Sequence, residues 1–154
     1  MLLQMLLALT EFRQNDQKNR FRPLIEYKYI GLDVKVTGWG VTDDTTFYKP
    51  YSEDLLEISI QVKDERICER VHDFSFTENM ICAGGKKEDA CQGDSGGPMV
   101  MQHGHNQLYS LVGVVSWGDG CGKAEKPGVY TKVINYLDWI EQTTNTTLRH
   151  VPNG

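Results

Sequence analysis

A ten-residue stretch at positions 89–98, Asp-Ala-Cys-Gln-Gly-Asp-Ser-Gly-Gly-Pro, constrains the fold of this 154-residue chain more than any other segment. Gly96, Gly97 and Pro98, directly after Ser95, are among the poorest residues for beginning a packed helix. The residues that follow, Met-Val-Met, are typical of a strand. The stretch therefore predicts a glycine-rich turn that carries an exposed serine and leads into a β-strand.

Ser95 on such a turn is a candidate nucleophile. Its small neighbours let a substrate carbonyl approach and leave backbone N–H groups free to face a developing oxyanion. Gly93 and Ser95 are the expected donors of those N–H groups. The structural alternative is a loop that needs glycine only for positive φ angles.

The pattern Gly-x-Ser-x-Gly at 93–97 also fits the nucleophile elbow of α/β-hydrolases, in which an acid and then a histidine follow the serine. Asp119 or Asp138, followed by His150, supplies that chain order. The elbow requires a helix directly after the serine, however, and the Gly-Gly-Pro that follows Ser95 disfavours one.

Five motifs in the same order along the chain make it resemble the trypsin-like serine proteases of the chymotrypsin fold. The resemblance covers about residues 22–144. The motifs are Thr-Gly-Trp-Gly at 37–40, Asn-Met-Ile-Cys-Ala-Gly at 79–84, Cys-Gln-Gly-Asp-Ser-Gly-Gly-Pro at 91–98, Ser-Trp-Gly at 116–118 and Lys-Pro-Gly-Val-Tyr at 126–130. The implied activity is cleavage of proteins or peptides after Arg or Lys, with no cofactor or metal, and protein protease inhibitors are expected partners.

The resemblance also implies a catalytic role for each residue of the serine turn. Ser95 becomes the acylated nucleophile, and the N–H groups of Gly93 and Ser95 form the oxyanion hole. Asp94 becomes the partner of a new N-terminal ammonium that cleavage of a precursor creates. We expect the loop around Asp94 to be zymogen-like and partly disordered in the isolated chain.

Asp89 is expected at the base of a primary specificity pocket. A buried carboxylate without a partner is costly, so a substrate that brings its own cation is favoured. The structural alternative is that Asp89 continues the solvated charge run at 86–88. The resemblance places four further residues at this pocket: Ala90, Gly118, Gly128 and Tyr130.

Ser116, Trp117 and Gly118 resemble the segment that pairs with a bound peptide as an added antiparallel strand. The structural alternative for Trp117 is an ordinary core aromatic at the end of a strand.

Four cysteines permit three pairings. The resemblance implies Cys68 with Cys82 and Cys91 with Cys121, and it indicates an oxidising, secreted setting. A further disulfide that is usual in the family would join the two positions that Val34 and Met101 occupy in this chain. Because both are apolar, we expect this site to be packed as core.

The coarse pattern is all-β: a six-stranded antiparallel barrel with a C-terminal α-helix, equivalent to the second barrel of the chymotrypsin fold. Asp64 is predicted to cap a short helix at 64–73. Asn135 is predicted to cap a final helix whose apolar face includes Tyr136, Leu137, Trp139 and Ile140. The expected strands are 34–40, 55–62, 80–83, 98–102, 108–117 and 128–133, with a hairpin turn at 103–107 and a polar surface loop at 42–53.

Two parts of unequal size are expected. Residues 1–30 resemble the remnant of a first barrel and the inter-barrel linker, with Arg22-Pro23 in the linker and Met5 or Leu6 where the family has its catalytic aspartate. Residues 31–154 form the C-terminal barrel and helix. None of the histidines matches the catalytic position: His72, His103, His105 and His150. We therefore expect the isolated chain to be inactive, with a non-catalytic homologue that binds partners or inhibitors through the peptide groove as the alternative.

Composition excludes several other classes of function. The formal net charge of −5 gives no support for nucleic-acid binding, and no apolar run approaches the roughly 20 residues that cross a bilayer. No metal-ligand cluster is present in the sequence. The sequon at Asn145 is compatible with secretion, although so short a motif also arises by chance.

Overall fold

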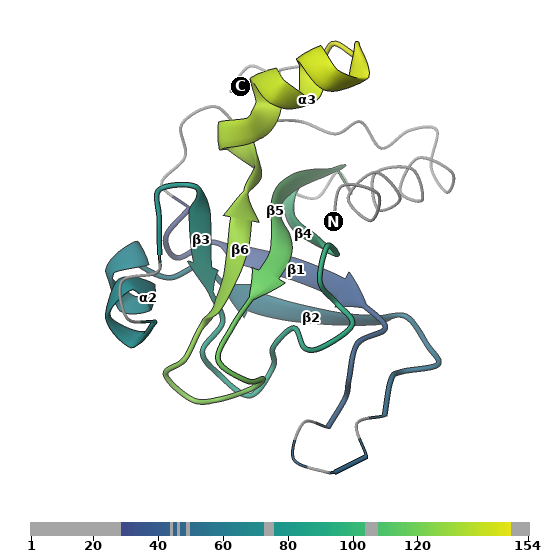
Figure 1. Cartoon of the computed structure of the whole chain (residues 1–154), viewed down its shortest axis with the longest axis vertical. Coiled ribbons are helices and arrows are strands. Elements are labelled where there is room, and N and C mark those ends of the chain that lie inside the picture. The colour runs from purple at the N-terminus through teal and green to yellow at the C-terminus, as the bar shows by residue number, and fades with distance from the viewer. Residues whose placement is uncertain are drawn as a thin grey trace.

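The computed structural model describes residues 29–43, 45, 47–48, 50–72, 76–103 and 108–148, and Figure 1 shows their arrangement. The predictions for residues 1–28, including Met5, Leu6 and the linker at 22–23, lie outside the described residues. So do residues 104–107 of the hairpin turn predicted at 103–107, together with His150, whereas His103 is the last residue of a strand.

Six antiparallel strands form one sheet in the order β2-β1-β4-β5-β6-β3. Figure 1 shows β1 and β2 running across the direction of β3 and β6, so the sheet is strongly curled. A bridge between Val62 and Ala83 joins its two edges. The predicted all-β class is confirmed, as a curled half-barrel. The strands are β1 Asp33–Gly38, β2 Leu56–Gln61, β3 Met80–Ala83, β4 Pro98–His103, β5 Leu108–Trp117 and β6 Gly128–Lys132.

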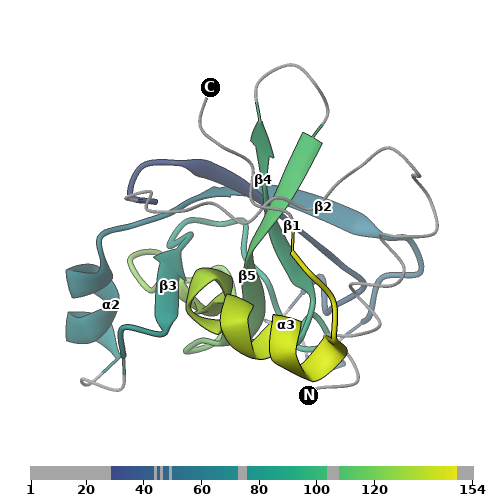
Figure 2. The same ribbon diagram turned by 90° about the horizontal axis from the view of Figure 1, so that it is seen from above.

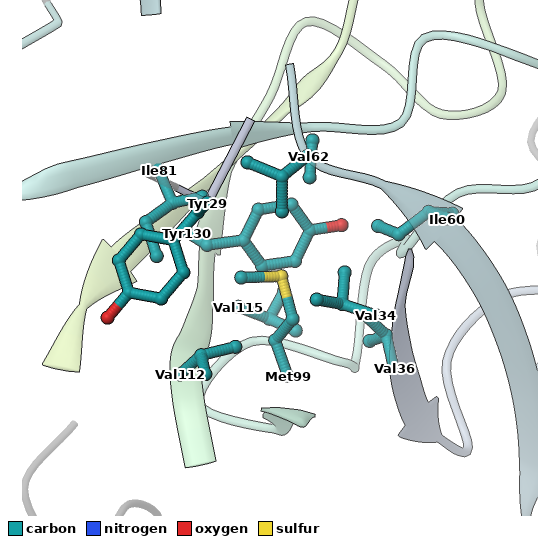
Figure 3. Close-up of a cluster of buried hydrophobic side chains, with 11 residues drawn as sticks. Tyr29, Val34, Val36, Ile60, Val62, Ile81, Met99, Val112, Val115 and Tyr130 are labelled. Carbon is teal, nitrogen blue, oxygen red and sulfur yellow. The ribbon is translucent and has the colours of Figure 1, made fainter. Parts of the chain in front are cut away.

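The curled sheet encloses an apolar core. In β1 the alternation of side chains buries Val34 and Val36 and leaves Asp33 exposed. Figure 3 shows the Met99 side chain pointing from β4 toward Val34 and Val115. Met101 packs against the same cluster. The site at Val34 and Met101 is therefore packed as core, as expected.

Two helical segments flank the sheet, and Figure 2 shows α3 lying across one end of it while α2 lies beside β3. Helix α2 covers Glu65–Val71, and the Asp64 carboxylate accepts a hydrogen bond from the backbone N–H of Arg66, as the predicted N-cap requires. A 3₁₀ turn at Val133–Tyr136 precedes α3, Leu137–Thr144.

The prediction that Asn135 caps the final helix is wrong. Its side-chain amide instead donates to the Glu78 carbonyl oxygen and the Asn79 Oδ1 atom. The 3₁₀ turn delays the start of α3 to Leu137, and no side chain caps it. The apolar face is also narrower than predicted, because the Trp139 side chain is 42% exposed whereas Ile140 is buried.

Both predicted disulfides are present, Cys68–Cys82 and Cys91–Cys121. Their partners are 14 and 30 residues apart in sequence. In the chain-entropy description, loops of this length stabilise a fold by roughly 3–4 kcal/mol each. The second disulfide ties the turn that carries Ser95 to the segment that follows β5.

Candidate active site

Three short hydrogen bonds hold the turn that carries Ser95. Within the turn, the N–H of Asp94 donates to the Cys91 carbonyl oxygen over 3.0 Å. The N–H of Gly97 donates to the Asp94 carbonyl oxygen over 2.8 Å. The N–H of Gly96 donates to the Val115 carbonyl oxygen on β5 over 2.9 Å. The turn is therefore anchored to the sheet, while the Ser95 side chain is exposed.

The two amides predicted to form an oxyanion hole are available to a ligand. Among the described residues, no carbonyl or side chain accepts a hydrogen bond from the N–H of Gly93 or of Ser95. Gly93 has a φ of +100°, a conformation that favours glycine. Free backbone donors beside an exposed hydroxyl are what stabilisation of a tetrahedral intermediate requires.

A cavity of about 180 Å³ opens beside Ser95. An engineered cavity of about 150 Å³ admits one benzene molecule, so this space suits one substrate side chain. It brings together the sequence-predicted pocket residues Asp89, Ala90, Ser116, Trp117, Gly118, Gly128 and Tyr130. A Cβ on Gly128 would lie only 3.2 Å from Asp89 Oδ1 and 3.3 Å from the Tyr130 hydroxyl oxygen, so the absence of a side chain keeps the space open.

Asp89 places an unpaired carboxylate at this cavity. Its Oδ2 atom accepts a hydrogen bond from the N–H of Gly122 over 3.0 Å, and no lysine or arginine of the described residues pairs with it. Burial raises the pKa of Asp89, while the N–H groups of Gly122 and Ala90 partly oppose this shift. The alternative that Asp89 simply continues a solvated charge run does not fit its half-buried position.

Tyr130 adds a second polar group to the cavity wall. Its side chain is 1% exposed, and its hydroxyl has no hydrogen-bond partner among the described residues. Burial, followed by the negative charges of Asp89 and Asp94, raises the pKa of Tyr130. A cationic group rich in N–H donors would complement both the carboxylate and this hydroxyl.

The predicted peptide-binding segment ends β5. Val115 pairs with Tyr130 and Trp117 with Val129, so Ser116 lies in a bulge without a ladder partner on β6. Trp117 is 36% exposed and lines the cavity, which argues against an ordinary core position. Backbone groups at such a bulge are accessible to an added strand.

Asp94 faces a second cavity, of about 230 Å³, on the other side of the turn. Its two carboxylate oxygens accept hydrogen bonds from the N–H groups of Gly40, over 2.8 Å, and Cys91, over 2.9 Å. A Cβ on Gly40 would collide with this carboxylate. The expected disorder of this loop in the isolated chain stays a prediction. The apolar part of the cavity wall includes Val36, Val41, Leu56 and Ile58.

The sequence analysis missed one residue beside the site. The Tyr51 ring packs so closely over Gly93 that a Cβ there would lie 2.5 Å from Tyr51 Cε1. An isolated bridge between Val41 and Tyr51 brings the ring to this place. The description of 42–53 as a polar surface loop was therefore incomplete, because Tyr51 and Phe47 are exposed aromatics.

No general base is positioned on Ser95 within the described residues. The His72 ring is buried, and its Nε2 atom lies 2.9 Å from the Pro127 carbonyl oxygen. The side chain of His103 lies outside the described set, as do His105 and His150. The described residues also contain no cluster of three or more metal-ligating side chains, and none of their helices is long and apolar enough to span a membrane.

Several known proteins are similar to this chain in sequence and fold. The family model described as Trypsin matches residues 7–140. The hepatocyte growth factor activator serine protease of Mus musculus is 42% identical over 125 residues, which cover 79% of this chain and 18% of the relative. Urokinase-type plasminogen activator of Gallus gallus is 42% identical over 121 residues, which cover 76% of this chain and 27% of the relative. Transmembrane protease serine 11B of Homo sapiens is 45% identical over 117 residues, which cover 73% of this chain and 27% of the relative.

Among solved structures, that of neuropsin, a serine protease expressed in the limbic system of mouse brain, superimposes with a TM-score of 0.69 at 36% identity. The match covers 82% of this chain and 53% of the neuropsin chain. The chain therefore spans about half of that structure and about a quarter or less of the curated relatives named above.

Proposed function

Because the chain belongs to the trypsin family of serine proteases, we propose that it supplies the nucleophile and the specificity pocket of a secreted endopeptidase that cleaves after Arg or Lys. The observation that carries this proposal is the cavity beside Ser95 that contains the half-buried, unpaired carboxylate of Asp89. The two disulfides favour the oxidising setting that secretion provides.

The proposed substrate binds by its backbone and by one side chain. Its main chain pairs with the segment 116–118 as an added strand. The Arg or Lys residue before the scissile bond places its side chain in the cavity. There its cation becomes the partner that the Asp89 carboxylate lacks. Gly118 and Gly128 leave space for the aliphatic part of that side chain.

The chemistry then follows from the serine turn. The Ser95 hydroxyl oxygen attacks the scissile carbonyl, and a base must accept its proton as the bond forms. The N–H groups of Gly93 and Ser95 stabilise the oxyanion. Departure of the leaving amine gives an acyl-enzyme on Ser95, which water hydrolyses to release the acid product.

The base and its orienting aspartate are proposed to come from the first barrel of the family fold, so the isolated chain is expected to be inactive. In another triad protease, loss of the histidine lowers turnover by about a millionfold. The second candidate function is a non-catalytic homologue that binds partners through the same groove. The lack of a base on Ser95 among the described residues favours this candidate for the chain by itself.

Chemical labelling of the serine separates the two candidates. A fluorophosphonate reacts with an activated serine hydroxyl with loss of fluoride. When the chain is joined to a trypsin-family first barrel that carries the histidine and the aspartate, stoichiometric labelling that disappears in Ser95→Ala therefore supports the catalytic proposal. Ser59→Ala, on the exposed face of β2, is the matched control. Labelling of that joined protein no faster than that of free serine, together with binding of an arginine-like cation, supports the binding protein instead.

A further inference from the structure

The sequence Asn-Thr-Thr at 145–147 is a motif that the proposed function does not use. It follows α3 directly, and all three side chains are exposed. Asn145 is the one asparagine of the chain with a serine or threonine two positions later, and the residue between them is not proline. In secreted proteins this is the sequence to which N-linked oligosaccharides are attached, at the protein surface.

The three residues form an exposed turn whose two ends are fixed. At the first end, the backbone N–H of Asn145 donates to the Glu141 carbonyl oxygen in the last turn of α3. At the other end, the backbone N–H of Leu148 donates to Glu141 Oε1 over 2.5 Å, and the Leu148 side chain packs against the buried cluster that contains Ile140. A group attached to Asn145 therefore projects into solvent from a turn that is anchored on both sides.

Helix termination explains part of this motif. Asn145 ends α3 with a φ of 50°, in the left-handed conformation that asparagine adopts more readily than most other residues. This accounts for Asn145 but not for Thr147. The Thr146 hydroxyl donates to the Thr144 carbonyl oxygen over 3.2 Å, whereas the Thr147 hydroxyl makes no hydrogen bond with another described residue. The hydroxyl that the acceptor sequence requires is therefore not one that the described fold uses.

The side-chain amide of Asn145 also makes no hydrogen bond with another described residue. Asn135 is the contrast, because its amide donates to the Glu78 carbonyl oxygen and to Asn79 Oδ1. An N-glycosidic bond replaces one N–H of the amide by a sugar. That replacement would remove a hydrogen bond at Asn135, whereas it removes none at Asn145.

We propose that Asn145 is a site of N-linked glycosylation, with a polyprenyl diphosphate-linked oligosaccharide as the donor. Asn145 Nδ2 forms a bond to C1 of the first sugar and loses one proton. The bond from C1 to the diphosphate oxygen breaks, and the polyprenyl diphosphate leaves with the electron pair. The proposal rests on the proposed function only in requiring that the chain enters the secretory pathway.

The oligosaccharide lies far from the cavity that contains Asp89. Strand β6 begins at that cavity with Gly128 and Tyr130, and its five residues span about 17 Å before the 3₁₀ turn and α3 follow. Figure 1 shows α3 beyond the end of β6, opposite to the segment that joins β5 to β6. The carbohydrate is therefore expected to leave ligand binding at the cavity unchanged.

Mass spectrometry of the full chain tests the site directly. The chain is produced in a secreting eukaryotic cell behind an added, cleavable signal peptide, and a peptide N-glycosidase then releases its oligosaccharide in heavy-oxygen water. The enzyme hydrolyses the bond between the side-chain carbonyl and Nδ2, so a glycosylated Asn145 becomes an aspartate that carries the isotope. Thr147→Val removes the hydroxyl with little change in shape, and Thr147→Ser retains it. Thr146→Val is the matched control, because it leaves the acceptor sequence intact.

We expect the labelled aspartate at position 145 in the wild type, Thr147→Ser and Thr146→Val, and unmodified Asn145 in Thr147→Val. Asp43→Asn supplies a positive control, because it creates a second acceptor sequence, Asn-Asp-Thr at 43–45, at an exposed position. An Asp43→Asn chain that carries oligosaccharide at position 43 but not at position 145 would overturn the proposal. So would a label at position 145 that persists in Thr147→Val, since it would not depend on the acceptor sequence.

Failure of the proposed function has a different result. The added signal peptide brings the chain into the secretory pathway in every case, so the modification of Asn145 does not depend on protease activity. The cationic pocket is judged separately, by calorimetry with benzamidine, a planar amidinium. A glycosylated chain that does not bind benzamidine would exclude the pocket and support the glycosylation site. Different affinities for benzamidine in the wild type and in Thr147→Val would contradict the remote position of the carbohydrate.

Discussion

Asp89 is the residue at which stability and function oppose each other. Burial raises its pKa in the folded chain above the ordinary value of about 3.9, so the folded state holds the proton more tightly than the unfolded state does. The stability that this carboxyl contributes is present below the unfolded pKa and is lost as pH rises through the folded pKa. At neutral pH the ionised Asp89 carboxylate therefore lowers the stability of the folded chain while the pocket is empty.

Asp89→Asn is accordingly expected to raise the free energy of unfolding at pH 7. The gain relative to wild type should grow as pH rises from about 4 and level off above the folded pKa. Denaturant unfolding at a series of pH values measures it, with Asp33→Asn as a control because Asp33 is exposed. A variant that is less stable than wild type at pH 7 would show that the carboxylate is needed for the fold.

A substitution at Gly118 tests the shape of the pocket independently of the pocket's charge. A Cβ there would meet only the Gly120 carbonyl oxygen at 3.6 Å and the Gly128 Cα at 3.8 Å, which are ordinary contacts. Gly118→Val should therefore fold normally and narrow the opening between the walls. We expect benzamidine binding to weaken at least about tenfold with an unchanged unfolding midpoint, and a variant that still binds at wild-type strength would place the ligand elsewhere.

At the scale of elements, the serine turn depends on its contact with the residues that follow β1. Gly40 both donates a hydrogen bond to Asp94 and leaves room for its carboxylate. Gly40→Ala should displace that carboxylate and cost about 1–3 kcal/mol of stability, as overpacking usually does. Amide hydrogen exchange at Gly93 and Ser95 should accelerate in the variant, and equal exchange rates would mean that the turn holds its shape without Asp94.

The sequence predicted elements well where the signal was local. Alternation and turn residues placed all six strands within two residues, and Asp64 was recognised as a cap because its partner is Arg66, two residues away. Asn135 was misjudged because its partners, Glu78 and Asn79, lie more than 50 residues away. Tyr51 was missed because the residue that its ring covers, Gly93, lies 42 residues away in the sequence. The pocket residues were found through motifs, although only the fold brings 89–95, 116–121 and 128–130 to one cavity.

At the scale of the whole molecule, the described surface exposes many large hydrophobic side chains. Nine large hydrophobic side chains of the described residues are more than one third exposed: Ile30, Trp39, Phe47, Tyr48, Tyr51, Leu55, Leu56, Trp117 and Trp139. Because trypsin-family domains pack two barrels against each other, we expect the isolated chain to bind a hydrophobic dye and to self-associate. Sedimentation that shows a monomer at all concentrations, without dye binding, would contradict this expectation.

Equilibrium binding of charged and neutral ligands shows whether Asp89 makes the cavity beside Ser95 selective for a cation. We expect the wild-type chain to bind benzamidine about 10- to 100-fold more tightly than it binds neutral benzamide, and Asp89→Asn to remove most of this difference. Equal affinities for the two ligands, or a preference that survives in Asp89→Asn, would contradict it.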